Sequence, residues 1–129
     1  MIRRGGCRCG ALRFEAEGEP VNVRFCHCRL CQKTTGQPFF SRALYGRDRL
    51  TIEGPLAEHA SSAGSHRGFC PTCGTVVFAL RQDVPFAGVA LGAFDEPDGL
   101  APTAHIFTES RLAWLKLDDG LPQYPRGAP

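Results

Sequence analysis

The sequence predicts a mainly β, antiparallel fold with little helix. Short segments alternate apolar and polar residues, glycine and proline interrupt them at short intervals, and few stretches are long enough for a helix. Such alternation with period two is typical of strands that have one face in water. A chain of 129 residues with 43% hydrophobic residues has the size and apolar content of one folded unit. We therefore expect a single domain over residues 1–129.

Two strands are expected in the first part of the chain. Residues 12–17 and 21–25 both alternate apolar with polar side chains, and Gly18 and Pro20 lie between them. Two alternating runs separated by turn residues are typical of a hairpin. We therefore expect these two strands to pair with each other.

A short helix is expected next, over residues 29–35. Gly36 can cap its C-terminus, and Pro38 prevents the helix from continuing. Strand-like alternation then returns over residues 38–45 and 50–53.

The second half of the chain adds further short strands. Residues 57–68 are polar with a loop rich in serine and glycine, and their secondary structure stays open. Apolar runs rich in valine and phenylalanine predict buried strands at residues 76–80 and 86–94, and a last strand is expected at 104–108. The tail, residues 118–129, contains several prolines and glycines and is expected to be irregular.

Charge and hydropathy patterns argue against several classes of partner. The net charge of +2 comes from 15 basic and 13 acidic residues without a basic block, which argues against nucleic acid. No run of about 18 apolar residues occurs, so we expect no membrane association. No apolar export signal precedes the first cysteines, and we expect a soluble, cytoplasmic protein.

The seven cysteines form three tight groups, C-x-C, C-x-C-x-x-C and C-x-x-C, with none left over. An odd number without an export signal argues against a disulfide framework, and such groups in a reducing compartment typically bind metal. In zinc proteins four ligands form a structural site, whereas three leave a position open for substrate. We therefore predict two zinc ions per chain, one structural and one catalytic.

The predicted structural site uses Cys7, Cys9, Cys70 and Cys73. Each pair occupies a short turn, and the glycine that follows each pair permits the positive φ that a turn around a metal tends to need. Joined through the metal, the pairs would connect the N-terminal edge of the sheet to its middle. The alternative is that one pair consists of buried thiols or a redox C-x-x-C.

The predicted catalytic site uses Cys26, Cys28 and Cys31. Three thiolates around Zn²⁺ leave a net charge of about −1, which suits a thiol substrate better than the generation of hydroxide. Coordination removes the proton of a thiol and holds the thiolate in place. The alternatives are a metal-buffering loop or a second structural zinc with a histidine as fourth ligand; the candidate histidines are His59, His66 and His105.

Several segments resemble the glutathione-dependent formaldehyde-activating enzyme family, which also includes centromere protein V. The resemblance covers roughly residues 5–125 in the right order, and cysteines at these spacings make it specific. The segments that carry it are residues 6–14 (GCRCGALRF), 26–32 (CHCRLCQ), 36–39 (GQPF), 69–74 (FCPTCG), 102–107 (PTAHIF) and 110–115 (SRLAWL).

This resemblance implies a β-tent fold with the two zinc sites that the cysteine spacing predicts. It also implies a carbon-sulfur lyase of the S-(hydroxymethyl)glutathione synthase type, which condenses formaldehyde with glutathione or cleaves the adduct. The implied partners are a small-molecule thiol such as glutathione and a small aldehyde such as formaldehyde.

Other side chains are candidates for the surroundings of the cysteine triplet. Phe39 and Phe40 follow the helix and are expected to form a wall of the site. His27 and His66 are candidates for a general acid. Four arginines are candidates for binding the two carboxylates of glutathione: Arg24, Arg29, Arg42 and Arg67.

The competing interpretation is a non-catalytic, zinc-stabilised β module that binds a protein or another ligand. The fourth ligand of the triplet's metal distinguishes the two. Water, a thiol ligand or a vacant position there favours the enzyme, whereas a protein side chain favours the binding module. No pattern in the sequence indicates the oligomeric state.

Overall fold

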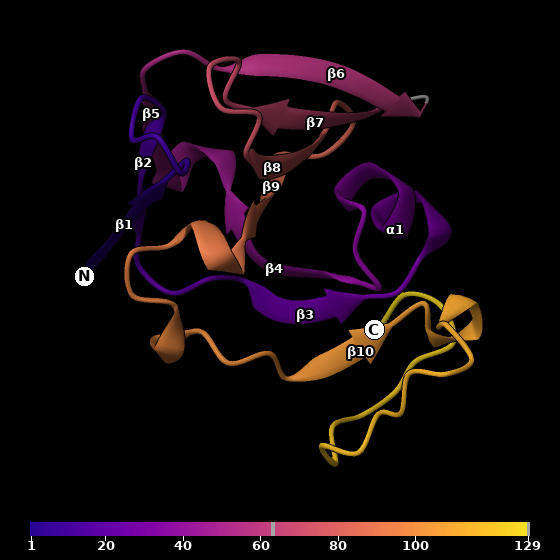
Figure 1. Cartoon of the computed structure of the whole chain (residues 1–129). Coiled ribbons are helices and arrows are strands. Elements are labelled where there is room, and N and C mark those ends of the chain that lie inside the picture. Colours follow the sequence, from indigo (N-terminus) through magenta and orange to yellow (C-terminus); the bar gives the residue numbers. More distant parts are fainter. Residues whose placement is uncertain (63, 129) are drawn as a thin grey trace.

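The computed structural model describes residues 1–62 and 64–128, and these residues form two β-sheets with one short α-helix (Figure 1). The prediction of a mainly β fold with little helix is confirmed. Residues 63 and 129, which belong to the segment of open secondary structure and to the predicted irregular tail, lie outside the described residues.

The smaller sheet contains the antiparallel strands β1 (Ile2–Gly6), β2 (Arg13–Glu17) and β5 (Leu50–Glu53), in the order β1-β2-β5. Strands β2 and β5 lie where the alternation predicts them. Strand β1 has no apolar–polar alternation that would predict it; its backbone pairs with β2 over its whole length.

The larger sheet has the strand order β10-β3-β4-β9-β8-β7-β6 among the described residues. Its pairs are antiparallel except for β10 and β3, which are parallel. Parallel neighbours need a crossover connection, and the irregular segment between β9 and β10 provides it. The strands are β3 (Asn22–Cys26), β4 (Phe40–Gly46), β6 (Ala57–Ser62), β7 (Ser65–Phe69), β8 (Val76–Arg81), β9 (Phe86–Ala90) and β10 (Ala104–Ile106).

The predicted hairpin of residues 12–17 and 21–25 is wrong, although both strands exist. Strand β2 pairs with β1 and β5, whereas β3 pairs with β4 and β10 in the other sheet. Gly18, with a φ of 77°, turns the chain away from β2. The N–H of Val21 then donates to the carbonyl oxygen of Leu44 at 2.7 Å. Alternation therefore identified the strands but not their partners.

Residues 57–68, for which the sequence indicates no secondary structure, fall largely within the antiparallel pair β6 and β7. Two predicted strands are shorter than expected. Strand β9 ends at Ala90 and continues as a 3₁₀ turn, Leu91–Ala93. Strand β10 ends at Ile106 because Phe107 adopts a left-handed conformation, with a φ of 55°, which an extended strand cannot contain.

The apolar core is divided into two clusters. The main cluster includes Phe14, whose ring packs edge-on against Phe78 and Phe94 at centroid distances of 5.6 Å and 5.0 Å. Cys7 and Cys70 belong to this cluster, whereas a smaller one contains Cys26, Cys31, Phe40 and Ile106. The two groups of cysteines are therefore buried in different parts of the core.

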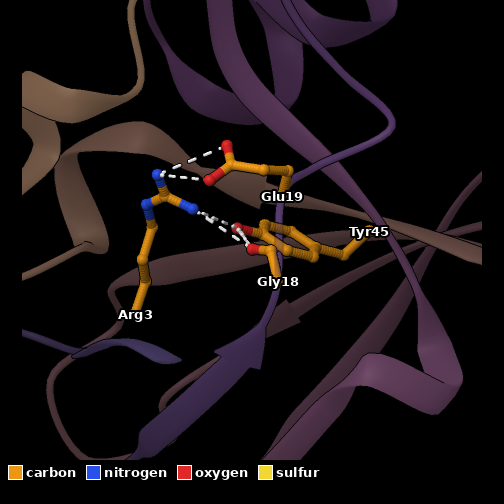
Figure 2. A network of polar contacts seen from close by, with 4 residues as sticks. All are labelled: Arg3, Gly18, Glu19 and Tyr45. Carbon is orange, nitrogen blue, oxygen red and sulfur yellow. Dashed lines mark hydrogen bonds and ion pairs between the residues drawn. The ribbon is translucent and has the colours of Figure 1, made fainter. Parts of the chain in front are cut away.

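A polar network also joins the two sheets (Figure 2). Arg3 of β1 donates to the carbonyl oxygen of Gly18 at 3.1 Å and forms an ion pair with Glu19 at 3.3 Å. The hydroxyl of Tyr45 in β4 donates to the same carbonyl at 3.2 Å. Tyr45 is almost fully buried, so this hydrogen bond offsets the cost of removing its hydroxyl from water.

The C-terminal segment lies beside β10 (Figure 1). The N–H of Tyr124 donates to the carbonyl oxygen of His105, and that of His105 donates to the carbonyl oxygen of Pro122, both at 2.9 Å. The only regular pairing described in this segment is the bridge between His105 and Gln123.

Among the described residues, no helix is both long and apolar enough to cross a membrane.

Candidate metal sites

Two loops of similar geometry carry the four-cysteine group. Cys7 and Cys9 follow β1, and Cys70 and Cys73 lie between β7 and β8. In each loop the N–H of the first cysteine donates to the carbonyl oxygen of the residue five positions later in the sequence. The N···O distance is 2.9 Å for Cys7 and 3.0 Å for Cys70. The glycines after the pairs have φ angles of 85° and 80°, as the sequence predicted.

The four sulfur atoms converge on one point, within 4.8 Å of one another. The Sγ atoms of Cys9 and Cys70 are 3.8 Å apart. Sulfurs at the corners of a tetrahedron around zinc, each at about 2.3 Å from it, are separated by about 3.8 Å. The residues therefore fit a tetrahedral metal site, which would join the smaller sheet to the larger one instead of linking two parts of a single sheet.

Hydrogen bonds around the four-cysteine group favour the thiolates of Cys7 and Cys73, whereas the neighbouring thiols raise the pKa of Cys9. The backbone N–H of Leu12 donates to the Sγ of Cys7 at 3.3 Å. Hydrogen bonds from Thr75, whose Oγ1 is 3.1 Å from the Sγ of Cys73, lower the pKa of Cys73 to about 5. Since metal ligands must be deprotonated, these contacts prepare the group to bind a metal.

The end of β3 and the start of helix α1 carry the cysteine triplet. Cys26 ends β3, where its neighbours are Phe40 in β4 and Ile106 in β10. Cys28 is the N-cap of α1 (Arg29–Thr35), and its Sγ accepts the N–H of Cys31 at 3.3 Å. The helix occupies the predicted residues and ends at the predicted glycine. The turn from β3 into α1 thus directs all three sulfurs to one side.

The triplet sulfurs also lie within 4.8 Å of one another, and among the described residues no histidine or carboxylate joins their cluster. Hydrogen bonding with the thiols of Cys26 and Cys31 lowers the pKa of Cys28, while the pKa of Cys26 is raised by its hydrogen bonds with Cys28 and Cys31. Cys28 is therefore the first of the three to become a thiolate. The residues present fit a metal ion held by three protein ligands.

A cavity of about 380 Å³ opens beside the triplet. A volume of this size is typical of small-molecule sites, which are about 300–1,000 Å³. Phe40, one of the two predicted wall residues, lines the cavity, whereas Phe39 packs edge-on against the ring of Phe25. The apolar part of the wall is completed by Leu30, Leu44, Leu80, Val84, Phe86, Ile106 and Phe107.

The histidines do not complete the triplet as fourth ligands. His105 makes hydrogen bonds through both ring nitrogens, Nδ1 to His27 at 2.8 Å and Nε2 to Asp119 at 2.7 Å. His59 is an exposed residue of the edge strand β6. His66 lines the cavity but does not belong to the sulfur cluster.

His27 is not placed to act as a general acid. Its side chain is fully buried and does not line the cavity. Burial, assisted by His105, lowers the pKa of His27 to about 4. At neutral pH the ring is therefore uncharged and lacks the second proton of an imidazolium.

The chain of Asp119, His105 and His27 was not predicted, because no local pattern relates the tail to β3. The carboxylate of Asp119 accepts the N–H of His105 Nε2, and the Nδ1 of His105 is hydrogen-bonded to the Nε2 of His27. This hydrogen bond to His105 lowers the pKa of Asp119. The chain of hydrogen bonds thus attaches the tail to the turn that carries the triplet.

Replacing Asp119 by alanine is expected to loosen the tail, because the buried Nε2 of His105 loses its acceptor. Amide exchange at Tyr124, measured by NMR, should become several-fold faster. Asp118→Ala, a change at an exposed neighbouring residue, is the matched control and should leave it unchanged. Equal exchange in both variants would show that the tail does not depend on this contact.

Two of the four predicted arginines reach the cavity. Arg42 of β4 and Arg67 of β7 line it, whereas Arg29 donates to the side chain of Gln32 on the helix and Arg24 is not among the lining residues. Arg81, which the sequence did not single out, also lines the cavity and forms an ion pair with Asp83 at 2.9 Å.

Comparison with known proteins gives matches to a family model, to curated relatives and to solved structures. The family model described as "Glutathione-dependent formaldehyde-activating enzyme" matches residues 2–110. A protein of Halomonas elongata, whose name places it provisionally among these enzymes, is 26% identical over 131 aligned positions, which cover 92% of this chain and 82% of that protein. A crystal structure of a Rhodobacter sphaeroides protein aligns with a TM-score of 0.58 at 22% identity, covering 94% of this chain and 98% of the other. The crystal structure shows the same fold.

Proposed function

Because this chain belongs to the glutathione-dependent formaldehyde-activating enzyme family, we propose that it is a zinc-dependent enzyme of the carbon-sulfur lyase type. It adds a thiol such as glutathione to a small aldehyde such as formaldehyde, or cleaves the adduct. Cys26, Cys28 and Cys31 hold the catalytic zinc, and Cys7, Cys9, Cys70 and Cys73 hold the structural one. The cytoplasm, a reducing compartment, would keep all of these thiols free.

One observation carries this proposal: three converging sulfurs border a cavity of about 380 Å³. No fourth side chain joins them within the part of the chain that the structure describes. Three protein ligands and an adjacent cavity are typical of a catalytic zinc site, whereas a structural site is closed by a fourth ligand. This arrangement favours the enzyme over the binding module.

The reaction forms one S–C bond while the carbonyl becomes a hydroxymethyl group, and the proton lost by the thiol ends on the former carbonyl oxygen. A zinc ion at the triplet would lower the pKa of a bound thiol and so supply thiolate at neutral pH. The Nη2 of Arg67 donates to the Sγ of Cys31 at 3.4 Å and so offsets part of the negative charge of the sulfurs. Phe40 and Ile106, both buried beside the sulfurs, exclude water from this side.

Exchange spectroscopy by NMR tests the activity directly. In a mixture of glutathione and formaldehyde, the wild-type protein with zinc is expected to speed interconversion between free thiol and adduct, because it concentrates and orients the thiolate. Cys28→Ser should leave the rate at the value without protein. An unchanged rate with the zinc-loaded wild type would contradict the proposed activity.

A further inference from the structure

The side chain of Arg67 is buried beside the triplet with unpaired donors. It is 8% exposed, and its guanidinium lies over the ring of Phe40, 5.2 Å from the centroid. One nitrogen, Nη2, donates to Cys31, whereas Nε and Nη1 are buried and have no partner among the described residues. Buried donors without acceptors are rare and costly in folded proteins. An acceptor from outside the chain would account for them.

Arg42 brings a second guanidinium to the same cavity. Its side chain passes over β9 at Gly88, where an added Cβ would lie 2.9 Å from the Cδ of Arg42. Its Nη1 donates to the amide oxygen of Asn22 at 2.6 Å. Burial lowers the pKa of Arg42, and its side chain lines the same cavity as the three cysteines.

Among the described residues, no carboxylate balances the charges of these two arginines. The lining of the cavity contains no aspartate or glutamate, and neither Arg42 nor Arg67 takes part in an ion pair within the described residues. A metal with three thiolates has a charge of about −1 and can offset only one of the two guanidinium groups. One positive charge is left at the inner wall of the cavity, and buried charges are normally paired.

We propose that Arg67, together with Arg42, binds a carboxylate of the thiol substrate, so that the cavity selects thiols that carry a negative charge. This inference rests on the proposed function and adds the residues that determine its specificity. Arg67 already contacts a triplet sulfur, so a carboxylate bound by its remaining donors lies close to the site of the thiol. Guanidinium groups favour carboxylates because their planar donors match the two oxygens.

A pair of thiols that differ only in charge tests this proposal. The probes are 3-mercaptopropionate and 3-mercaptopropionamide, titrated into cobalt-loaded protein, with the sulfur-to-cobalt charge-transfer absorbance as the measure of binding. The wild type is expected to bind the acid about tenfold to a hundredfold more tightly than the amide, the typical effect of charge-assisted hydrogen bonds. In Arg67→Gln this ratio should fall about tenfold or more below the wild-type ratio.

Two controls separate specificity from folding. Arg81→Gln changes an arginine of the same cavity that is paired with Asp83, and it should keep the wild-type ratio. If circular dichroism shows that Arg67→Gln does not fold, Arg42→Gln replaces it and should also lower the ratio. Comparing ratios between proteins removes the intrinsic difference in thiol acidity between the two probes.

The outcomes distinguish this inference from the function on which it rests. Equal binding of both probes by the wild type, or an unchanged ratio in the folded arginine variant, overturns the inference and leaves a thiol-binding site intact. Failure of the wild type to bind the probes or glutathione at the metal overturns the proposed function and the inference with it.

Discussion

Cys70→Ser is expected to leave the chain unfolded. Cys70 is fully buried in the main core, and its sulfur belongs to the group that joins the two sheets. A structural zinc contributes on the order of 10–16 kcal/mol of apparent binding free energy, whereas a whole domain is stable by roughly 5–15 kcal/mol. The measurement is the dispersion of amide signals in NMR spectra, together with far-ultraviolet circular dichroism.

Removal of metal from the wild type by a chelator should have the same effect as Cys70→Ser, because the loss of the metal and not the change of side chain causes unfolding. Cys31→Ser is the matched control, since Cys31 is also buried but lies in the smaller cluster. It should retain dispersed spectra. A Cys70→Ser protein that unfolds cooperatively near the wild-type temperature would show that the four-cysteine group is not essential to the fold.

Cys28→Ser is expected to remain folded and to lose activity. Cys28 is half-buried and caps the helix, where its Sγ accepts the N–H of Cys31. Serine is among the preferred N-cap residues, so its oxygen can accept the same hydrogen bond. The change at the helix cap should therefore alter the free energy of unfolding by no more than about 1 kcal/mol, while a soft metal ligand is lost.

The activity of Cys28→Ser, measured as exchange between free and adduct glutathione, should fall to the rate without protein. Thermal unfolding of the same sample provides the control for the fold. A variant that keeps its wild-type exchange rate would show that Cys28 does not take part in the reaction. A variant that unfolds as completely as Cys70→Ser would show that the triplet is structural.

The sequence predicted individual elements better than their arrangement. Strand β5 and helix α1 have their predicted bounds because alternation, a capping glycine and a following proline are local signals. Pairing is not local: β2 and β3 adjoin in sequence but belong to different sheets. The parallel pair of β10 and β3 depends on a long crossover, and β1 contains no signal beyond its pairing with β2.

The cysteine groups were predictable because ligands on one tight turn must be close in sequence. Their convergence within 4.8 Å agrees with the division into four and three. The surroundings of the triplet were less predictable, because they come from strands that are distant in sequence. Arg42 and Arg67 reach the cavity and Arg24 and Arg29 do not, although Arg24 lies directly opposite Arg42 in the sheet, and no pattern in the sequence indicates this difference.

The roles of the histidines also depend on tertiary contacts that no local pattern in the sequence indicates. His105 was a candidate ligand by residue type alone, but the contact with Asp119 in the tail engages it elsewhere. His27 lies between two predicted ligands, yet its ring faces the buried side of the turn. Only the tertiary structure separates these roles.

The measurement that tests the division of the cysteines most directly is the number of metal ions per folded chain, determined by elemental analysis of the wild type and of Cys28→Ser. We expect two zinc ions in the wild type and one in the folded variant. A wild type with a single zinc, or a folded Cys28→Ser protein that still holds two, would contradict the division into a structural and a catalytic site.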